Sequence, residues 1–150
     1  MTWRTAIAVT GGAALTAVLV TGCGSTTPSA GGAAGGGTPL DASCTATGTD
    51  AGLEVTFKVT PCPAKGGGAA GAATITVKDA AGKAVEGAKV EINPEMPNMK
   101  MKGGNQSASA QGGGYEAKLV LGMPGDWTVT VVVTPETGKA STTAFDVKAA

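Results

Sequence analysis

Between residues 53 and 147 the chain is a series of short stretches in which apolar and polar residues alternate. Turn-forming residues, chiefly Gly, Pro and Asp, separate these stretches. Because successive side chains of a β-strand point to opposite faces of a sheet, the alternation predicts strands with one buried face. The pattern is clearest in four stretches: 53–60, 115–121, 127–133 and 143–147. It predicts an all-β domain.

Two further parts of this region are less regular. Residues 74–77 and 84–92 flank the turn-like sequence D-A-A-G-K at 79–83, and we interpret them as a β-hairpin in which Gly87 marks a bulge or a change of face. Residues 105–111 are polar, and we expect either a poorly hydrophobic edge strand or a loop. Several short strands in about 100 residues are typical of an immunoglobulin-like β-sandwich, here with about 7 strands.

Composition then narrows the classes of function. The chain has 150 residues, 15% of them charged, with a formal net charge of zero, so it predicts no basic surface for nucleic acid. It contains no His, which removes the commonest general base and the usual imidazole ligand of zinc and Cu(II). We therefore expect neither an enzyme nor a nucleic-acid partner. Thioether and thiolate ligands for a metal remain.

The first 22 residues have the pattern of a secretory signal peptide. Arg4 is followed by a mostly apolar run at 6–20 that is too short and too rich in Gly for a membrane-spanning helix. The sequence Val20-Thr21-Gly22-Cys23 resembles the lipobox of bacterial lipoproteins. This resemblance implies that Cys23 is lipidated and becomes the new N-terminus. An ordinary signal peptide followed by a free Cys, or an uncleaved anchor, is the alternative.

The sequence thus divides into three parts. Residues 1–22 are the signal peptide, and residues 23–42 are the lipidated Cys and a tether rich in Gly, Ser, Thr and Pro. Residues 43–150 are the β-sandwich. We expect the protein at the extracytoplasmic face of the cell membrane, held there by its lipid. The sequence gives no oligomeric state.

Cys44 and Cys62 remain as a pair when Cys23 is assigned to the lipid. A disulfide is the expected state of such a pair in an oxidising compartment. It would hold the weakly patterned residues 40–50 against the strand at 53–60. The alternative is that two reduced thiolates join a metal site.

Three of the five methionines, Met96, Met99 and Met101, lie within the sequence N-P-E-M-P-N-M-K-M-K at 93–102. The Pro, Asn and Lys residues between them are typical of an exposed turn. Because thioethers are ligands that select Cu(I), the first hypothesis is a Cu(I) site. The alternative is that these side chains fold inward and fill the core, as Met commonly does.

The order of these features resembles the YtkA-like domain family, an immunoglobulin-like group related to FixH proteins. The resemblance is carried by T-P-C-P at 60–63, T-I-T-V-K-D-A-A-G-K-A-V-E-G-A-K-V at 74–90, M-P-N-M-K-M at 96–101, G-G-Y-E-A at 113–117 and L-G-M-P-G-D-W-T-V-T-V at 121–131. It implies an extracytoplasmic module, sometimes linked with copper handling. It also implies four metal ligands: Met96, Met99, Met101 and Met123. Relatives have a His after the Met cluster, which this sequence lacks.

The leading hypothesis is therefore a membrane-anchored lipoprotein that binds or delivers Cu(I) through its Met-rich turn. It requires the turns at 93–102 and 122–126 to meet at one end of the sandwich. The alternative is a structural or protein-interaction module without metal, accessory to a membrane complex. The expected partners are the membrane, through the lipid, and a membrane protein or copper-handling protein.

Overall fold

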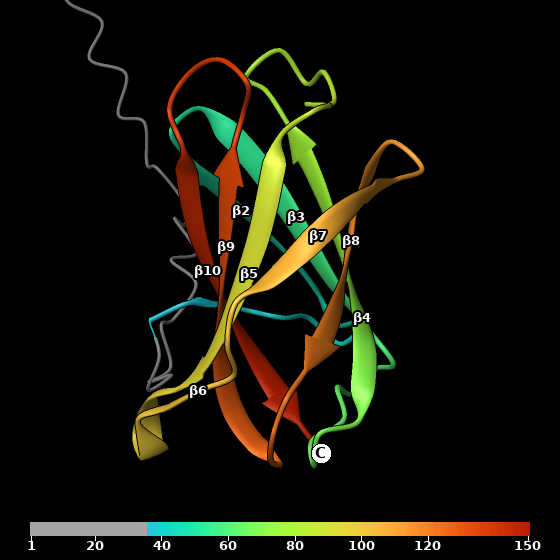
Figure 1. The fold of residues 1–150 in the computed structure, drawn as a ribbon, viewed down its shortest axis with the longest axis vertical. Helices are drawn as coiled ribbons and strands as arrows, with labels where there is room; N and C mark the ends of the chain where they lie inside the picture. Colours follow the sequence, from blue (N-terminus) through green and yellow to red (C-terminus); the bar gives the residue numbers. More distant parts are fainter. Residues whose placement is uncertain (1–35) are drawn as a thin grey trace, which may run out of the picture.

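A computed structural model describes residues 36–150, which form a single β-sandwich (Figure 1). The predicted signal peptide at 1–22, the lipidation site Cys23 and the tether up to residue 35 lie outside the described residues. Within residues 36–150, no helix is both long and apolar enough to cross a membrane. The predicted all-β fold class is confirmed.

The described chain contains ten strands and one short 3-10 helix. In order they are β1 (Thr38–Pro39), β2 (Thr45–Asp50), β3 (Leu53–Thr60), β4 (Ala70–Lys78), β5 (Lys89–Met96), η1 (Pro97–Met99), β6 (Met101–Lys102), β7 (Gln106–Gln111), β8 (Gly114–Val120), β9 (Gly125–Thr134) and β10 (Ser141–Ala149). The number exceeds the predicted 7 mainly because β1 and β6 have two residues each. Strands that short leave no alternating pattern in a sequence.

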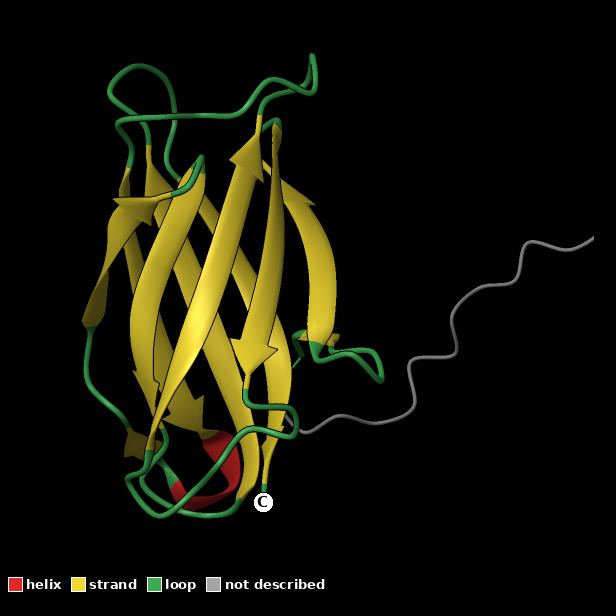
Figure 2. Cartoon of the chain, turned by 90° about the vertical axis from the view of Figure 1, so that its right-hand side faces the viewer, coloured by secondary structure: helices red, strands yellow, loops and turns green. Residues whose placement is uncertain are grey.

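The strands follow the order β1-β10-β9-β5-β7-β8-β4-β3-β2, and β6 is added to β5. The strands β1, β10, β9 and β5 form one layer, and β8, β4, β3 and β2 form the other. β7 joins the two layers, because Gln106–Ala108 pair with β5 and Ser109–Gln111 pair with β8. Figure 1 shows β7 crossing between them, and Figure 2 shows the strands of both layers running along the long axis. The sandwich is closed along this side.

The predicted hairpin between 74–77 and 84–92 is wrong in its pairing. The turn at 79–83 does reverse the chain, since Val85 N–H donates to Val77 O at 2.9 Å. The two segments then separate at Gly87, which has a φ of 72°. β5 pairs with β9 and β7 in the other layer. Gly87 thus marks the point at which the chain changes layer. Its positive φ is a backbone conformation that favours glycine.

Residues 105–111 contain a strand, β7, but this strand is not at an edge of the sheet. It lies between β5 and β8, at the side of the sandwich. Most of its side chains are exposed, which explains why its sequence is polar. A strand between two others can thus have exposed side chains. The polarity of the sequence indicates this exposure but does not indicate the place of the strand in the sheet.

The inward faces predicted from alternation form the core. Buried residues on these faces are Val55, Phe57, Val59, Tyr115, Ala117, Leu119, Leu121, Trp127, Val129, Val131, Val133, Phe145 and Val147. Phe57 and Phe145 come from opposite layers, and their rings stack with centroids 5.0 Å apart. Aromatic stacking of this kind adds to the stabilisation from apolar burial.

On the open side of the sandwich, β10 approaches β2. Thr142 N–H donates to Asp50 Oδ2 at 2.7 Å, which links the two strands. A Cβ on Gly48 would collide with Thr143 Cγ2. The absence of a side chain at Gly48 therefore lets the two layers come together along this seam.

The boundary of the domain lies earlier than the predicted residue 43. Thr38 and Pro39, which belong to the predicted tether at 23–42, pair in parallel with Phe145 and Asp146 of β10. Leu40 is partly buried against the core. The sequence did not predict this because a two-residue strand depends on the edge to which it binds.

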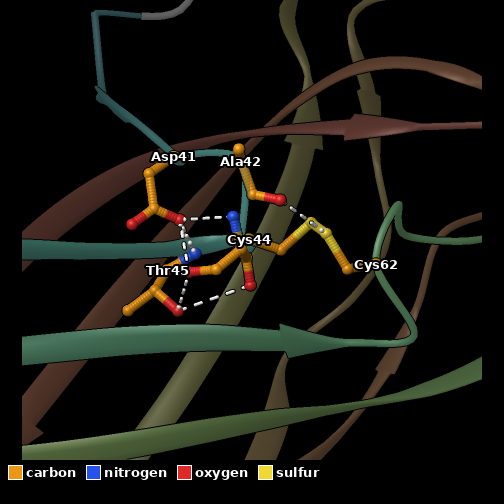
Figure 3. The surroundings of a disulfide bond; sticks show 6 residues. Asp41, Ala42, Cys44, Thr45 and Cys62 are labelled. Carbon is orange, nitrogen blue, oxygen red and sulfur yellow. Dashed lines mark hydrogen bonds between the residues drawn. A yellow bond between two sulfur atoms is a disulfide. The ribbon is translucent and has the colours of Figure 1, made fainter.

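The predicted disulfide between Cys44 and Cys62 is confirmed (Figure 3). It joins the residue before β2 to the turn after β3, with 5.7 Å between the two Cα atoms. Beside it, Asp41 Oδ1 accepts hydrogen bonds from Ser43 Oγ at 2.6 Å and from the backbone N–H of Thr45 at 3.0 Å. These hydrogen bonds stabilise the carboxylate and hold the pKa of Asp41 below its usual value, and the bond from the Ser43 side chain has the largest effect. The bonded sulfurs are not available as thiolate ligands.

Replacement of both cysteines by Ser is expected to lower the free energy of unfolding by about 3 kcal/mol, because the bond closes a loop across 18 residues. Urea denaturation of the wild type and the double variant measures the difference. Reduction of the wild type should give the same loss and a mass increase of two hydrogens. A loss below about 1 kcal/mol would contradict the assigned stabilising role.

Candidate metal centre

The Met-rich stretch at 93–102 is a hairpin and not an open turn. β5 continues through Met96, η1 forms the tip, and β6 returns beside β5. Met96 lies directly opposite Met101, and Glu95 lies directly opposite Lys102. Because cross-strand partners project from the same face of a sheet, the two methionines share the inward face and the charged pair shares the outward face.

The tip of the hairpin, at 97–100, turns tightly. Pro97 begins η1, and Lys100 ends it in the left-handed region with a φ of 52°. Lys100 N–H donates to Pro97 O at 3.2 Å, and below the tip Gly103 N–H donates to Pro94 O at 2.7 Å. The tip carries Met99 away from the paired strands.

The four methionines differ strongly in burial. Met96 is 4% exposed and belongs to the core, whereas Met99 is 60% exposed. Met101 and Met123 are partly buried and pack against the core. The interpretation of these residues as core filler therefore describes Met96 and does not describe Met99.

The turn that contains Met123 lies against the hairpin, as the metal hypothesis requires. A Cβ placed on Gly125 would lie 3.1 Å from Met96 Cε, and one placed on Gly122 would lie 4.0 Å from Met101 Sδ. In Figure 1, the β5–β6 hairpin and the connection from β8 to β9 occupy the same end of the sandwich. The structure thus brings Met96 and Met101 to the turn that carries Met123. We call this group, with Met99, the methionine end.

Trp127 supports this turn from inside the core. Its indole N–H donates to Met123 O at 2.9 Å, while its side chain is 1% exposed. On the other side, the loop at 64–69 packs on the turn, and Gly68 N–H donates to Leu121 O at 2.8 Å. The alternation at 127–133 predicted that Trp127 lies on a buried face, and it did not predict this hydrogen bond. The position of Trp127 four residues after Met123, in G-M-P-G-D-W, was the available signal for its role at the turn.

The charged groups near the methionine end do not form a site for a hard cation. Within residues 36–150, no three Asp, Glu, Cys or His side chains lie close enough together to hold a metal ion. In the same residues, the ion pair within 4.0 Å is Lys89 with Glu91. Lys100 and Lys102 are exposed, and no carboxylate of residues 36–150 lies within 4.0 Å of either. The donors that this end offers are neutral thioether sulfurs.

The loops at 85–87 and 110–115 lie at the opposite end of the sandwich (Figure 1). They line a pocket of about 360 Å³. Glu86 is the one acidic or basic residue among those that line it. Tyr115 fixes the first loop, because its hydroxyl accepts from Ala88 N–H and donates to Val85 O, both at 2.9 Å. We therefore interpret this region as a structural connection between the layers.

Limited oxidation by hydrogen peroxide is expected to modify Met99 first, Met101 and Met123 more slowly, and Met96 last, because oxidation of Met follows its exposure. Tandem mass spectrometry of proteolytic fragments measures the order. The same treatment in urea is the control, since all four residues should then react at similar rates. Equal rates for Met96 and Met99 in the folded protein would contradict the described burial.

Three comparisons with known proteins complete the description of the chain. No curated protein matches it. A solved structure, FetP of uropathogenic E. coli strain F11, expressed in the periplasm of E. coli BL21(DE3), shares 13% identity over 69% of this chain and 91% of its own, with a TM-score of 0.46. No catalytic family is among these findings, and the absence of enzyme activity stays a prediction.

The YtkA-like family model matches residues 48–132. This range is more than half of the sequence and contains all four methionines of the methionine end. The chain belongs to the YtkA-like family.

Proposed function

We propose that this protein is a lipid-anchored extracytoplasmic protein that binds Cu(I) at its methionine end and holds it for delivery. The single observation that carries the proposal is the meeting of the two turns. A Cβ placed on Gly122, the residue before Met123, would lie 4.0 Å from Met101 Sδ. Met99 is exposed on the adjoining tip of the hairpin. Soft donors therefore gather at one accessible place.

The chemistry of these donors favours Cu(I) over other ions. Thioethers are neutral and bind without losing a proton, so copper binding by them does not compete with protonation near neutral pH. They are soft ligands, which select Cu(I), whereas Mg²⁺, Ca²⁺ and Mn²⁺ need oxygen donors. The absence of His in the sequence removes the ligand that Cu(II) and Zn²⁺ would use. The expected selectivity is for the reduced ion.

The proposed location is supported by two features of the chain. The Cys44–Cys62 disulfide is typical of proteins in oxidising compartments outside the cytosol. The sequence V-T-G-C at 20–23 follows an apolar run, as in the lipobox of bacterial lipoproteins. In such a compartment free thiols are readily oxidised, so a copper site there benefits from thioether ligands.

The alternative is a structural or protein-interaction module that acts without metal, accessory to a membrane complex. One observation favours it. Met99 is the one large hydrophobic side chain of residues 36–150 that is strongly exposed, and an exposed apolar group at a hairpin tip is also suited to protein contact. This module would use the same end of the sandwich but would not need Met101 or Met123.

An anaerobic titration with Cu(I) tests the proposal, with a chromogenic Cu(I) chelator as competitor. The wild type is expected to take one Cu(I) from the chelator. The triple variant Met99→Leu/Met101→Leu/Met123→Leu should bind at least about 100-fold more weakly, because Leu keeps the volume but has no donor sulfur. Urea denaturation shows whether the variant is folded. No competition by the wild type would refute copper binding.

Gly122 offers a second arm of this experiment in which every sulfur is kept. Gly122→Leu should weaken binding, because its side chain extends toward Met101 Sδ. Gly122→Ala is the matched control, since its Cβ would make only an ordinary contact at 4.0 Å and should bind Cu(I) as the wild type does. Equal affinities of all three proteins would place any copper site away from this turn.

Lipid attachment is tested separately, in bacteria fed with radiolabelled palmitate. The wild type is expected to carry label and to sediment with membranes, whereas Cys23→Ala should carry none and remain in the soluble fraction. Cys62→Ala is the matched control, because it also lacks one cysteine and should still be labelled. Equal labelling of Cys23→Ala and the wild type would refute the anchor.

A further inference from the structure

The methionine end contains thioethers in three different environments. Met96 lies behind the hairpin in the core, with its methyl carbon against Gly125. Met101 and Met123 lie at the surface of the core, partly covered. Met99 lies outside, on the tip. An ion arriving from solvent therefore meets Met99 first, then Met101 and Met123, and Met96 last.

The tip that carries Met99 is also the least constrained part of the hairpin. The ladder between β5 and β6 consists of Glu95 with Lys102 and Met96 with Met101. Residues 97–100 lie beyond it and are held by the bond from Lys100 N–H to Pro97 O. Segments with few buried contacts and few backbone bonds open at low free-energy cost. Met99 can therefore change position while Met96 and Met101 stay paired.

From these observations we propose that Met99 is the exchange ligand of the copper site. Cu(I) is held by Met99, Met101 and Met123, and it leaves when a thioether of a protein partner takes the place of Met99. Met96 is not a ligand but closes the core beneath the site. This inference rests on the proposed function, and it adds the roles of the individual residues and the chemistry of the partner.

The exchange step is a ligand substitution at one metal ion. A bond forms between copper and the partner's thioether sulfur, and the bond between copper and Met99 Sδ breaks. Copper remains Cu(I) throughout, because no electron is transferred. No proton moves, since both sulfur ligands are neutral thioethers. The reaction therefore needs no oxidant, reductant or base.

The charges of the tip indicate the surface of that partner. Lys100 and Lys102 are exposed on either side of Met101. Glu95 lies opposite Lys102 in the strand pairing, but among the described residues no carboxylate is within 4.0 Å of either Lys. Bound Cu(I) adds a further positive charge, which neutral thioethers do not compensate. Together, Lys100, Lys102 and the bound ion outweigh the charge of Glu95 at the tip, and a net positive surface steers and orients a partner with a negative surface. The partner that fits is a protein whose methionine ligand is surrounded by Asp and Glu.

Methionine methyl groups report each step directly by NMR. The experiment uses the intact chain labelled with ¹³C at the methionine methyl groups, without oxygen, and assigns the signals with single Met→Leu variants. On addition of Cu(I), the signals of Met99, Met101 and Met123 are expected to shift, and that of Met96 to shift least. A synthetic peptide with one Met among Asp and Glu residues is then added in steps. The Met99 signal should return toward its metal-free position before those of Met101 and Met123.

Two variants with the same substitution separate the assigned roles. Met99→Leu should weaken Cu(I) binding at least about tenfold, as expected for loss of a ligand. Met96→Leu is the matched control and should change it less than about twofold, because it preserves the buried volume and removes no ligand.

The charge of the partner is tested with a second peptide in which Lys replaces the acidic residues. At low salt, the acidic peptide is expected to take Cu(I) from the wild type at least about tenfold faster than the basic peptide. A Trp beside the Met of each peptide reports copper by stopped-flow fluorescence. In Lys100→Gln/Lys102→Gln the difference between the peptides should largely disappear. Equal rates for both peptides with the wild type would overturn the acidic partner.

The remaining outcomes distinguish this inference from the proposed function. If Cu(I) shifts none of the four methyl signals, the proposed function itself fails. If the signals of Met96 and Met101 shift while that of Met99 does not, the copper site exists but the role assigned to Met99 is wrong. If all signals return together when the acidic peptide is added, Met99 is a ligand without a special role in exchange.

Discussion

The burial of every second side chain along β5 is the constraint on which the methionine end depends. Val90, Ile92, Pro94 and Met96 all point into the core. The alternation therefore determines that Met96 is inside, that its cross-strand partner Met101 is on the same face, and that the tip between them is outside. The hairpin has little freedom to choose another arrangement, because a shift of one residue would expose the whole apolar face of β5.

The sequence predicted which faces of the strands are buried, since that information is local and repeats every two residues. It did not predict which strands pair. The segments 74–77 and 84–92 were expected to form a hairpin, and nothing local shows that Gly87 sends the chain to the other layer. In the sequence, the buried positions of β5 could be recognised only as far as Ile92. Pro94 hid the continuation of the strand to Met96, because Pro is rare inside strands.

The candidate site was predicted as a set of residues and not as a set of roles. The four methionines were identified from their spacing and from a family resemblance, and the two turns lie together as the hypothesis required. Their unequal burial was not predictable, because it depends on where β5 ends and on how the turn at Met123 is held by Trp127. The disulfide between Cys44 and Cys62, in contrast, could be predicted from two facts. Two cysteines remain once Cys23 is assigned to the lipid, and the expected compartment is oxidising.

The parallel pairing of β1 with β10 has a consequence for how molecules of this protein behave at high local concentration. A free edge of a β-sheet is a template on which strands of neighbouring molecules can assemble. Thr38 and Pro39 occupy part of that edge, and Pro39 has no N–H to offer an approaching strand. The segment that leads from the proposed anchor therefore covers this part of the edge of β10, and it leaves an approaching strand fewer backbone donors with which to pair.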